Sequence, residues 1–188
     1  MPTVYKLWGD GDCQALNTVN FEDYNRESSS KKTGIQTWSF DGTRVRKAWK
    51  PLEVYVREPR LIKPEIWPLV NTFALERDAA VILQLPLDQS CEQLVLPFEG
   101  RKLIVMNVTY VLECLDTKKS VFDPDLPHDI DEFVFHADRL DYSLFKIPQN
   151  SYMTFTVEGL ASPDDEFKPL VEKHGLKGVR FQKVWSWE

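Results

Sequence analysis

The sequence predicts an α+β fold in one domain: a mostly antiparallel mixed sheet with two or three short flanking helices. Alternating apolar and polar residues, the pattern of half-buried strands, recur along the chain, whereas helical spacing is confined to a few stretches. The 188 residues, 43% hydrophobic and 12% aromatic, suffice for one sizeable core and exclude extensive disorder. No internal repeat or linker requires a second domain, so we expect one domain over residues 1–188.

The first strands are expected early in the chain. Residues 4–8 alternate and precede the Gly-Asp-Gly-Asp turn of residues 9–12. Residues 25–34 are polar and predict an exposed loop, after which residues 35–40 alternate strictly and residues 54–56 are rich in β-forming types. We therefore predict that a sheet begins in the first third of the chain.

The middle of the chain predicts a helix followed by a hairpin. Apolar residues with helical spacing place the helix at about Phe73 to Gln84, and Pro86 is expected to stop it. The apolar runs 94–98 and 103–115 flank a Gly-containing turn, which predicts a β-hairpin whose second run forms a central strand. Cys114 is then a small core residue rather than a nucleophile.

The C-terminal part predicts a short helix among further strands. Ser162 is a suitable N-cap and Gly175 a suitable helix end, while Pro169 implies either a kink or a start near Lys168. The remaining alternation predicts strands at residues 133–135, 152–157 and 179–185.

Cysteine usage, charge and short apolar runs restrict the class of protein. Cys13, Cys91 and Cys114 are widely spaced with no C-x-x-C pair, so we expect neither a disulfide framework nor a zinc site, and a reducing cytoplasm fits best. No apolar run approaches about 18 residues and the N-terminus lacks a signal-like segment, so we expect no membrane interaction. The net charge of -6 argues against binding of nucleic acid.

The charge is unevenly distributed along the chain. Residues 26–63 hold ten bases and four acids, a net +6, whereas residues 113–141 hold nine acids and three bases, a net -6. One interpretation is two solvated faces that partly cancel each other. The other is an acidic patch that captures a basic protein partner, because such charge raises association rate and selectivity.

The densest polar cluster spans residues 123–132. A calcium loop requires a Gly at its tight turn, which this segment lacks. A transition-metal site would need His128 and His136 on the same face, and nothing in the sequence holds them there. No phosphate-binding glycine loop and no local signature of a catalytic thiol is present. We expect no cofactor, no metal and no catalytic residue. The candidate partner-binding residues are Asp123, Asp125, His128, Asp129, Asp131 and Glu132.

Several segments together resemble a known family. The run MNVTYVLECLD of residues 106–116 is followed by Leu-Phe-Lys-Ile-Pro at 144–148, by Val-Glu-Gly-Leu at 157–160, and by Gly-Leu-Lys-Gly-Val-Arg-Phe at 175–181 with Val-Trp at 184–185. In order and spacing they are similar to the eleventh class of bacterial polymorphic-toxin immunity proteins. The resemblance covers about residues 74–185, while residues 1–70 match only loosely.

The resemblance implies a cytoplasmic, non-enzymatic protein that is encoded beside a toxin. Such a protein would bind the cognate toxin and neutralise it by stoichiometric protein–protein inhibition, and the family supplies no catalytic residues. Two alternatives stay open, an enzyme of unrecognised class and a regulatory binding module without a toxin partner. The activity of the toxin and the oligomeric state are not predicted.

Overall fold

The computed structural model describes residues 1–18, 40–51, 53–69, 71–126, 128–150 and 152–187. The predicted loop at 25–34 and all but the last residue of the predicted strand at 35–40 lie outside these ranges. The described residues form twelve strands, three short α-helices and three 3-10 turns, so the α+β class is confirmed. Every strand pair is antiparallel, and parallel contacts occur only as isolated bridges in the described chain.

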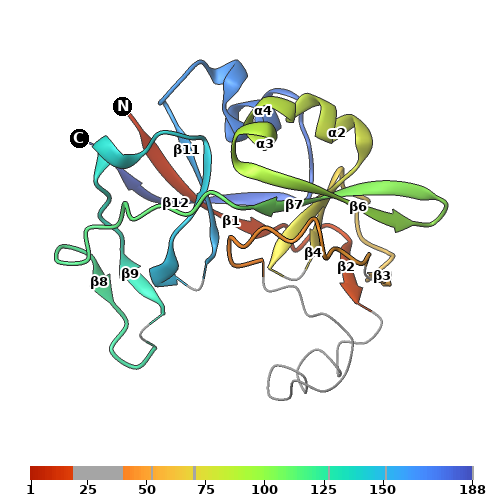
Figure 1. Cartoon of the computed structure of the whole chain (residues 1–188), viewed down its shortest axis with the longest axis horizontal. Helices are drawn as coiled ribbons and strands as arrows, with labels where there is room; N and C mark the ends of the chain where they lie inside the picture. Colours follow the sequence, from red (N-terminus) through yellow and green to blue (C-terminus); the bar gives the residue numbers. More distant parts are fainter. Residues whose placement is uncertain (19–39, 52, 70, 127, 151, 188) are drawn as a thin grey trace.

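One four-stranded sheet, here the terminal sheet, combines both ends of the chain (Figure 1). β1 lies between β11 and β12, and β10 is the other outer strand. These strands alternate between two apolar clusters, with Leu7 on one face and Val4 on the other. The bounds are Thr3–Gly9 for β1, Leu144–Lys146 for β10, Thr154–Glu158 for β11 and Val179–Ser186 for β12.

The other four-stranded sheet, here the central sheet, has the order β4-β5-β7-β6. Its strands are β4 (Ile66–Leu69), β5 (Thr72–Leu75), β6 (Cys91–Phe98) and β7 (Arg101–Val108). Two small sheets pair β2 (Ala15–Thr18) with β3 (Val54–Arg57), and β8 (Val121–Phe122) with β9 (Ile130–Glu132). The predicted hairpin is confirmed as β6 and β7, which pair from Cys91 with Val108 to Phe98 with Arg101.

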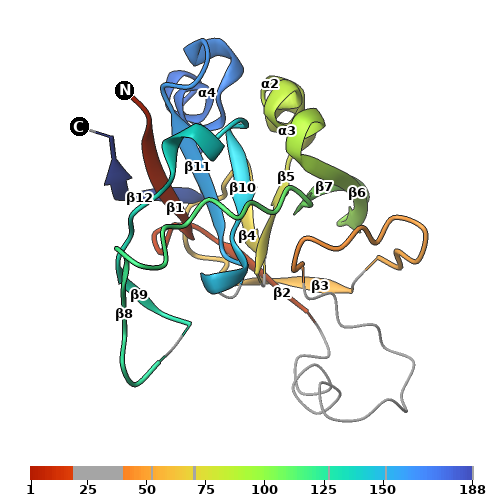
Figure 2. The same cartoon turned by 60° about the vertical axis from the view of Figure 1, so that its left-hand side comes forward.

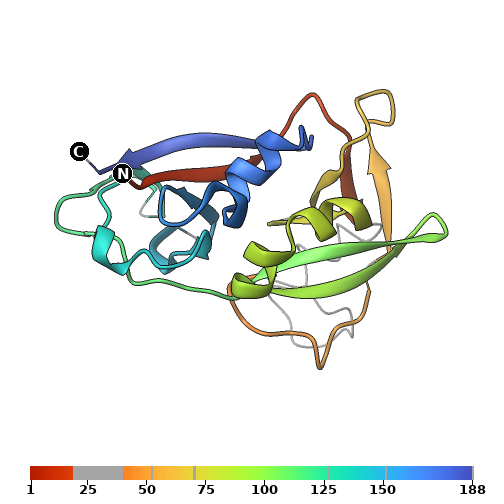
Figure 3. The same ribbon diagram turned by 90° about the horizontal axis from the view of Figure 1, so that it is seen from above.

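The helices lie between the two large sheets when the molecule is seen from above (Figure 3). They are α2 (Arg77–Ile82), α3 (Gln84–Ser90) and α4 (Phe167–Lys173). Their buried side chains join Leu7 and Val179 of the terminal sheet and Leu75 and Met106 of the central sheet in one apolar cluster. This shared core holds the two sheets together.

The predicted helix at Phe73–Gln84 is wrong at both ends. Residues 72–75 form β5, in which Phe73 faces one apolar cluster and Ala74 the other. A strand buried on both faces is apolar throughout, so its pattern does not distinguish it from a buried helix. Pro86 does not stop the helix but lies in the first turn of α3, where no intrahelical N–H bond is lost.

Two predicted strand ranges also differ from the structure. β7 ends at Val108, and residues 110–115 form only isolated bridges with Lys146 and Phe135. In the region of the predicted strand at 133–135, the ladder instead covers Ile130–Glu132. The terminal helix is confirmed with its start at Phe167, while Ser162 caps the preceding 3-10 turn.

Gly178 makes the passage from the helix into β12 possible. Its φ of +109° lies in the region that glycine adopts freely, and a Cβ at this position would collide with the backbone oxygen of Ile66. Ile66 N–H donates to the carbonyl of Lys177 at 2.9 Å on the same crossing. The glycine therefore allows the terminal sheet to approach β4 of the central sheet.

Candidate functional site

The predicted acidic segment forms a hairpin that projects from the body of the molecule (Figure 1). We call residues 121–132 the acidic hairpin. Its loop is closed by the Asp123 N–H donating to the carbonyl of Asp129 at 3.0 Å and by the Asp129 N–H donating to that of Leu126 at 2.7 Å. The Asp123 Oδ1 accepts from the N–H groups of Asp125 at 2.7 Å and Leu126 at 3.0 Å. Asp123 is thus a structural residue of the loop.

The acidic hairpin is fixed to the core at its loop and at its strands. The buried Asn150 donates from Nδ2 to the carbonyl of His128 at 2.8 Å. Phe122 and Ile130 are half-buried and pack against the cluster that contains Phe133 and Phe135. The hairpin is therefore held in its loop by a hydrogen bond and at its strands by apolar packing, which favours one defined conformation.

The structure brings the predicted site residues together on this hairpin. The side chains of Asp125, His128, Asp129, Asp131 and Glu132 are exposed, and that of Asp123 is half-buried. In the described part of the chain, none of these side chains forms an ion pair. Asp129 feels the positive charge of Lys6 without forming an ion pair with it, and exposed carboxylates without an ion pair are free to meet a cation on another molecule.

Metal chemistry receives no support from the arrangement of ligand-type residues. Among the described residues, no group of three His, Cys, Asp or Glu side chains is arranged to hold a metal ion. His136 is half-buried beyond the end of the acidic hairpin, with its N–H donating to the carbonyl of Cys114 at 2.8 Å. His128 and His136 therefore belong to different structural units.

The cysteines are poorly suited to nucleophilic attack. All three are free thiols, and Cys114 is fully buried as predicted. Burial raises the pKa of Cys114 to about 12 and also raises the pKa values of Cys91 and Cys13. Because the thiolate is the reactive form, these groups are protonated and unreactive near neutral pH.

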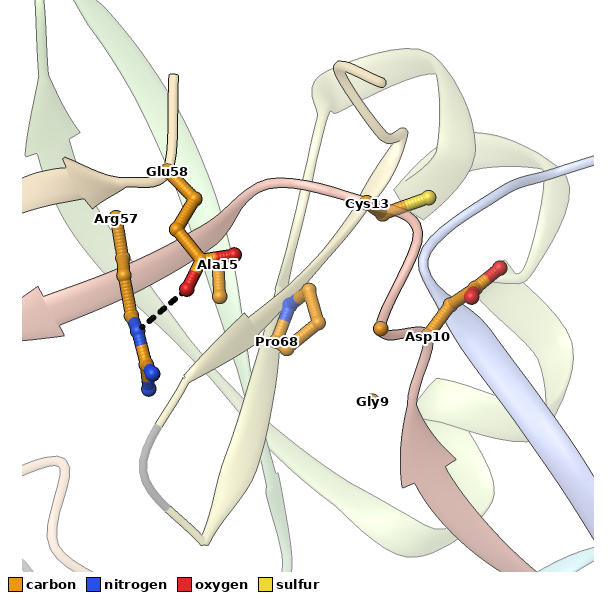
Figure 4. A pocket seen from close by; sticks show the side chains of 8 residues that line it. Gly9, Asp10, Cys13, Ala15, Arg57, Glu58 and Pro68 are labelled. Atoms are coloured by element: carbon orange, nitrogen blue, oxygen red, sulfur yellow. Dashed lines mark ion pairs between the residues drawn. The ribbon is translucent and has the colours of Figure 1, made fainter. Parts of the chain in front are cut away.

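A hollow of about 280 Å³ lies where β1 gives way to the turn at residues 9–12 (Figure 4). Its polar side chains are engaged with neighbours: the Arg57 Nε lies 3.3 Å from the Glu58 Oε1, and the Asp10 Oδ1 lies 2.7 Å from the Arg180 guanidinium. Among the described residues that line it, Cys13 is the only nucleophile, with the raised thiol pKa described above. Asp10 is hydrogen-bonded to the Cys13 thiol, but its carboxylate is also paired with Arg180, and its negative charge raises the thiol pKa and so disfavours the reactive thiolate.

Two buried charges, Lys146 and Glu166, are absent from the sequence predictions. The Lys146 ammonium, 1% exposed, donates to the carbonyl of Tyr152 at 2.7 Å, and burial lowers its pKa to about 8. The Glu166 carboxylate, also 1% exposed, accepts from the backbone N–H groups of Gly159, Leu160 and Ala161 at 2.6–3.0 Å. The hydrogen bonds of both charged groups hold loops in place rather than point into a cavity, so these charges are structural.

Comparison with known proteins gives no match, either to a protein-family model or to a curated protein. No helix in the described ranges has the length and apolar character needed to cross a lipid bilayer. The fold and the candidate site define an α+β protein with a fixed, projecting acidic hairpin as its most distinct exposed feature.

Proposed function

We propose that this protein is a cytoplasmic immunity protein, which binds a cognate toxin and neutralises it by stoichiometric protein–protein inhibition. The proposal combines the resemblance of residues 74–185 to a toxin-immunity family with the geometry of the acidic hairpin. The observation that carries it is the set of exposed, unpaired carboxylates on a hairpin anchored by Asn150. A fixed loop binds with a smaller entropy loss than a mobile one.

Electrostatic attraction is the expected mode of capture. Residues 113–141 have a net charge of -6, and the acidic hairpin places five of their acids on one projection. A basic surface on the toxin would be steered toward this projection, which raises the association rate. Contact would then extend to neighbouring surface until the interface reaches about 800 Å² on each partner.

A non-catalytic role agrees with the chemistry of the described residues. The thiols have raised pKa values, and the charged groups around the hollow of Figure 4 are in ion pairs, Arg57 with Glu58 and Asp10 with Arg180. Catalysis requires a nucleophile or base that is accessible and close to a group that activates it. We therefore favour inhibition by binding over an enzyme of unrecognised class.

Charge reversal on the acidic hairpin tests the proposal. Asp129→Lys combined with Asp131→Lys changes the net charge from -6 to -2, because each replacement adds two positive charges. We expect the double variant to associate about tenfold more slowly with the toxin encoded by the adjacent gene, and the difference to shrink above about 0.1 M salt. The measurement is stopped-flow association together with survival of toxin-producing cells.

The matched control is Glu53→Lys combined with Asp78→Lys, which makes the same change in net charge. Both positions are exposed, Glu53 directly before β3 and Asp78 on α2. This control is expected to protect cells, since its charges lie outside the acidic hairpin. Equal association rates for both double variants would assign the effect to net charge alone. Failure of the unmodified protein to bind that toxin would leave a regulatory binding module as the better proposal.

A further inference from the structure

The outer strands of the two large sheets differ in what covers them. The outer edge of β10 is covered by backbone bonds, because Lys146 N–H donates to the carbonyl of Tyr110 and Leu112 N–H to that of Lys146, both at 2.9 Å. On the outer edge of β4, the Ile66 N–H donates to the carbonyl of Lys177. On the outer edge of β6, the Trp49 indole donates to the carbonyl of Val95 at 2.8 Å. Three of the four outer strands thus have partners beyond their own sheet.

β12 is the exception. In the described part of the chain its only paired strand is β1, and Figure 3 shows this dark blue strand along the outside of the terminal sheet. Asp10 N–H donates to the carbonyl of Gly178, and antiparallel pairs bond at every second residue. Arg180 and Gln182 therefore bond toward β1, and the backbone groups of Phe181 and of Lys183, in the last regular pair before a register shift in β12, point outward.

An outward row of backbone donors and acceptors fits another extended chain, since such a chain offers the complementary row. β12 is eight residues long, and the structure describes no proline within it. By contrast, the outer edge of β6 contains Pro97, which lacks an N–H to offer. Of the four outer strands of the two large sheets, β12 has the edge that can accept a strand.

Beside its C-terminal end, β12 borders an open hollow of about 420 Å³. Trp185 and Trp187 line it together with His136 and the carboxylate of Asp138. Aromatic faces next to a carboxylate suit a guanidinium or ammonium group, which stacks on the ring and pairs with the acid. The hollow also lies within the reach of the -6 charge of residues 113–141, to which Asp138 belongs.

We propose that β12 is extended by a strand of the toxin, which pairs with the outward backbone groups of Phe181 and Lys183 and places an Arg or Lys side chain in the hollow of Trp185, Trp187 and Asp138. This inference rests on the proposed function and adds the mode of docking to it. Backbone pairing supplies the register, and the hollow supplies selectivity for a basic segment.

A second copy of this chain fits the same edge less well. Two copies pairing antiparallel about a two-fold axis normal to the sheet present the same face to each other. Lys183 pairs with Tyr5 on the α4 face, away from the hollow, and Arg180 is bound to Asp10 and Asp12 at 2.7 Å. Of the cations on β12, a second copy therefore offers none to the hollow.

Two substitutions at one exposed position isolate the outward N–H. Lys183→Pro removes the side chain and the N–H, whereas Lys183→Thr removes the side chain and keeps the N–H. We expect Lys183→Pro to bind the adjacently encoded toxin at least about tenfold more weakly than Lys183→Thr. Asp138→Asn and Trp187→Ala are each expected to weaken binding about fivefold, by loss of the cation's partners. Binding is measured by titration calorimetry.

Hydrogen exchange provides a readout that does not depend on a folded proline variant. In the unmodified complex, the amides of Phe181 and Lys183 are expected to exchange at least about tenfold more slowly than in the free protein, while the amides of Gln93 and Val95 on β6 change little. Toxin binding with unchanged exchange at Phe181 and Lys183, or equal affinity of the two Lys183 variants, overturns strand addition but leaves the proposed function standing. Absence of toxin binding by the unmodified protein overturns both, and a dimer that only Lys183→Pro dissociates assigns the edge to a second copy.

Discussion

The acidic hairpin and the interior beside the terminal sheet hold charged side chains in opposite ways. On the hairpin, carboxylates such as Asp125 and Asp131 are exposed and have no ion-pair partner among the described residues. In the interior, Lys146 and Glu166 are 1% exposed and bonded to backbone groups of loops. The charges of the hairpin are therefore free to pair with another molecule, whereas the two buried charges are committed to the fold.

Under the proposed function, stability and recognition depend on different charges. An exposed charge contributes about 0–1 kcal/mol to folding, so the sequence of the acidic hairpin is free to follow the needs of a partner. A buried charge carries a desolvation penalty of several kcal/mol, which its bonds must offset. The three stability predictions below test this separation.

The largest effect is expected from Glu166→Ala. This substitution removes the acceptor for the N–H groups of Gly159, Leu160 and Ala161, which hold the loop before α4. Hydrogen bonds to a charged group contribute about 1.5–3 kcal/mol, so we expect a loss of about 2–4 kcal/mol in the free energy of unfolding. Urea denaturation measures it, with Asp165→Ala as the neighbouring control. A loss below about 1 kcal/mol would mean that water replaces the carboxylate at these exposed N–H groups.

The next effect is a gain in stability from Lys146→Met. Burial lowers the pKa of Lys146 from 10.5 to about 8, so its ammonium destabilises the folded state by about 3 kcal/mol at pH 7. Loss of the bond to the carbonyl of Tyr152 reduces the expected net gain to about 2 kcal/mol. The variant is compared with the unmodified protein by thermal unfolding at several pH values.

The sign of the pH dependence distinguishes burial of the ammonium from simple packing. Below pH 8 Lys146 is charged in both the folded and the unfolded states, so the full penalty applies. Between pH 8 and 10.5 the folded state loses the proton first, and the stability of the unmodified protein rises relative to Lys146→Met. The gain should therefore fade across this window. A gain that stays constant to pH 10.5 would instead reflect better packing by Met.

The smallest effect is expected on the acidic hairpin. Asp125→Asn combined with Glu132→Gln removes two exposed charges that form no ion pair within the described chain. We expect the free energy of unfolding to change by less than about 0.5 kcal/mol, as measured by urea denaturation. Asp123→Asn is a useful comparison because Asp123 bonds to the loop backbone. A loss above about 1 kcal/mol in the free energy of unfolding for the first pair would mean that those charges help to fold the hairpin.

Local pattern was sufficient for the elements whose two faces differ. β1, β11 and β12 alternate between faces, and the Gly100 turn between β6 and β7 is marked by its residue type, so their positions follow from sequence. The prediction of a helix failed at β5 because both faces of this strand are buried and its residues are therefore almost uniformly apolar. The distinction between strand and helix at residues 72–75 is decided by the neighbouring strands β4 and β7, which sequence patterns do not contain.

The candidate site was predicted as a set of residues but not as a shape. Charge density alone located residues 123–132, while the pairing of β8 with β9 and the support from Asn150 depend on contacts far along the chain. Asp123 carried a local signal, because an Asp before Pro-Asp commonly bonds to the backbone two residues on. Nothing local marks Lys146 or Glu166 as buried, since their acceptors and donors lie on loops that the fold positions.

The placement of β1 between β11 and β12 has a consequence for how the protein is made. Lys6 pairs with Phe155 and with Gln182, so β1 leaves the ribosome long before either partner exists. The central sheet spans residues 66–108 and has all its strands early, whereas the terminal sheet must wait for residue 186. A chain interrupted before residue 154 would carry β1 with both edges unpaired and recognisable to chaperones or proteases. The terminal sheet thus forms only after β12 has been synthesised, much later than the central sheet.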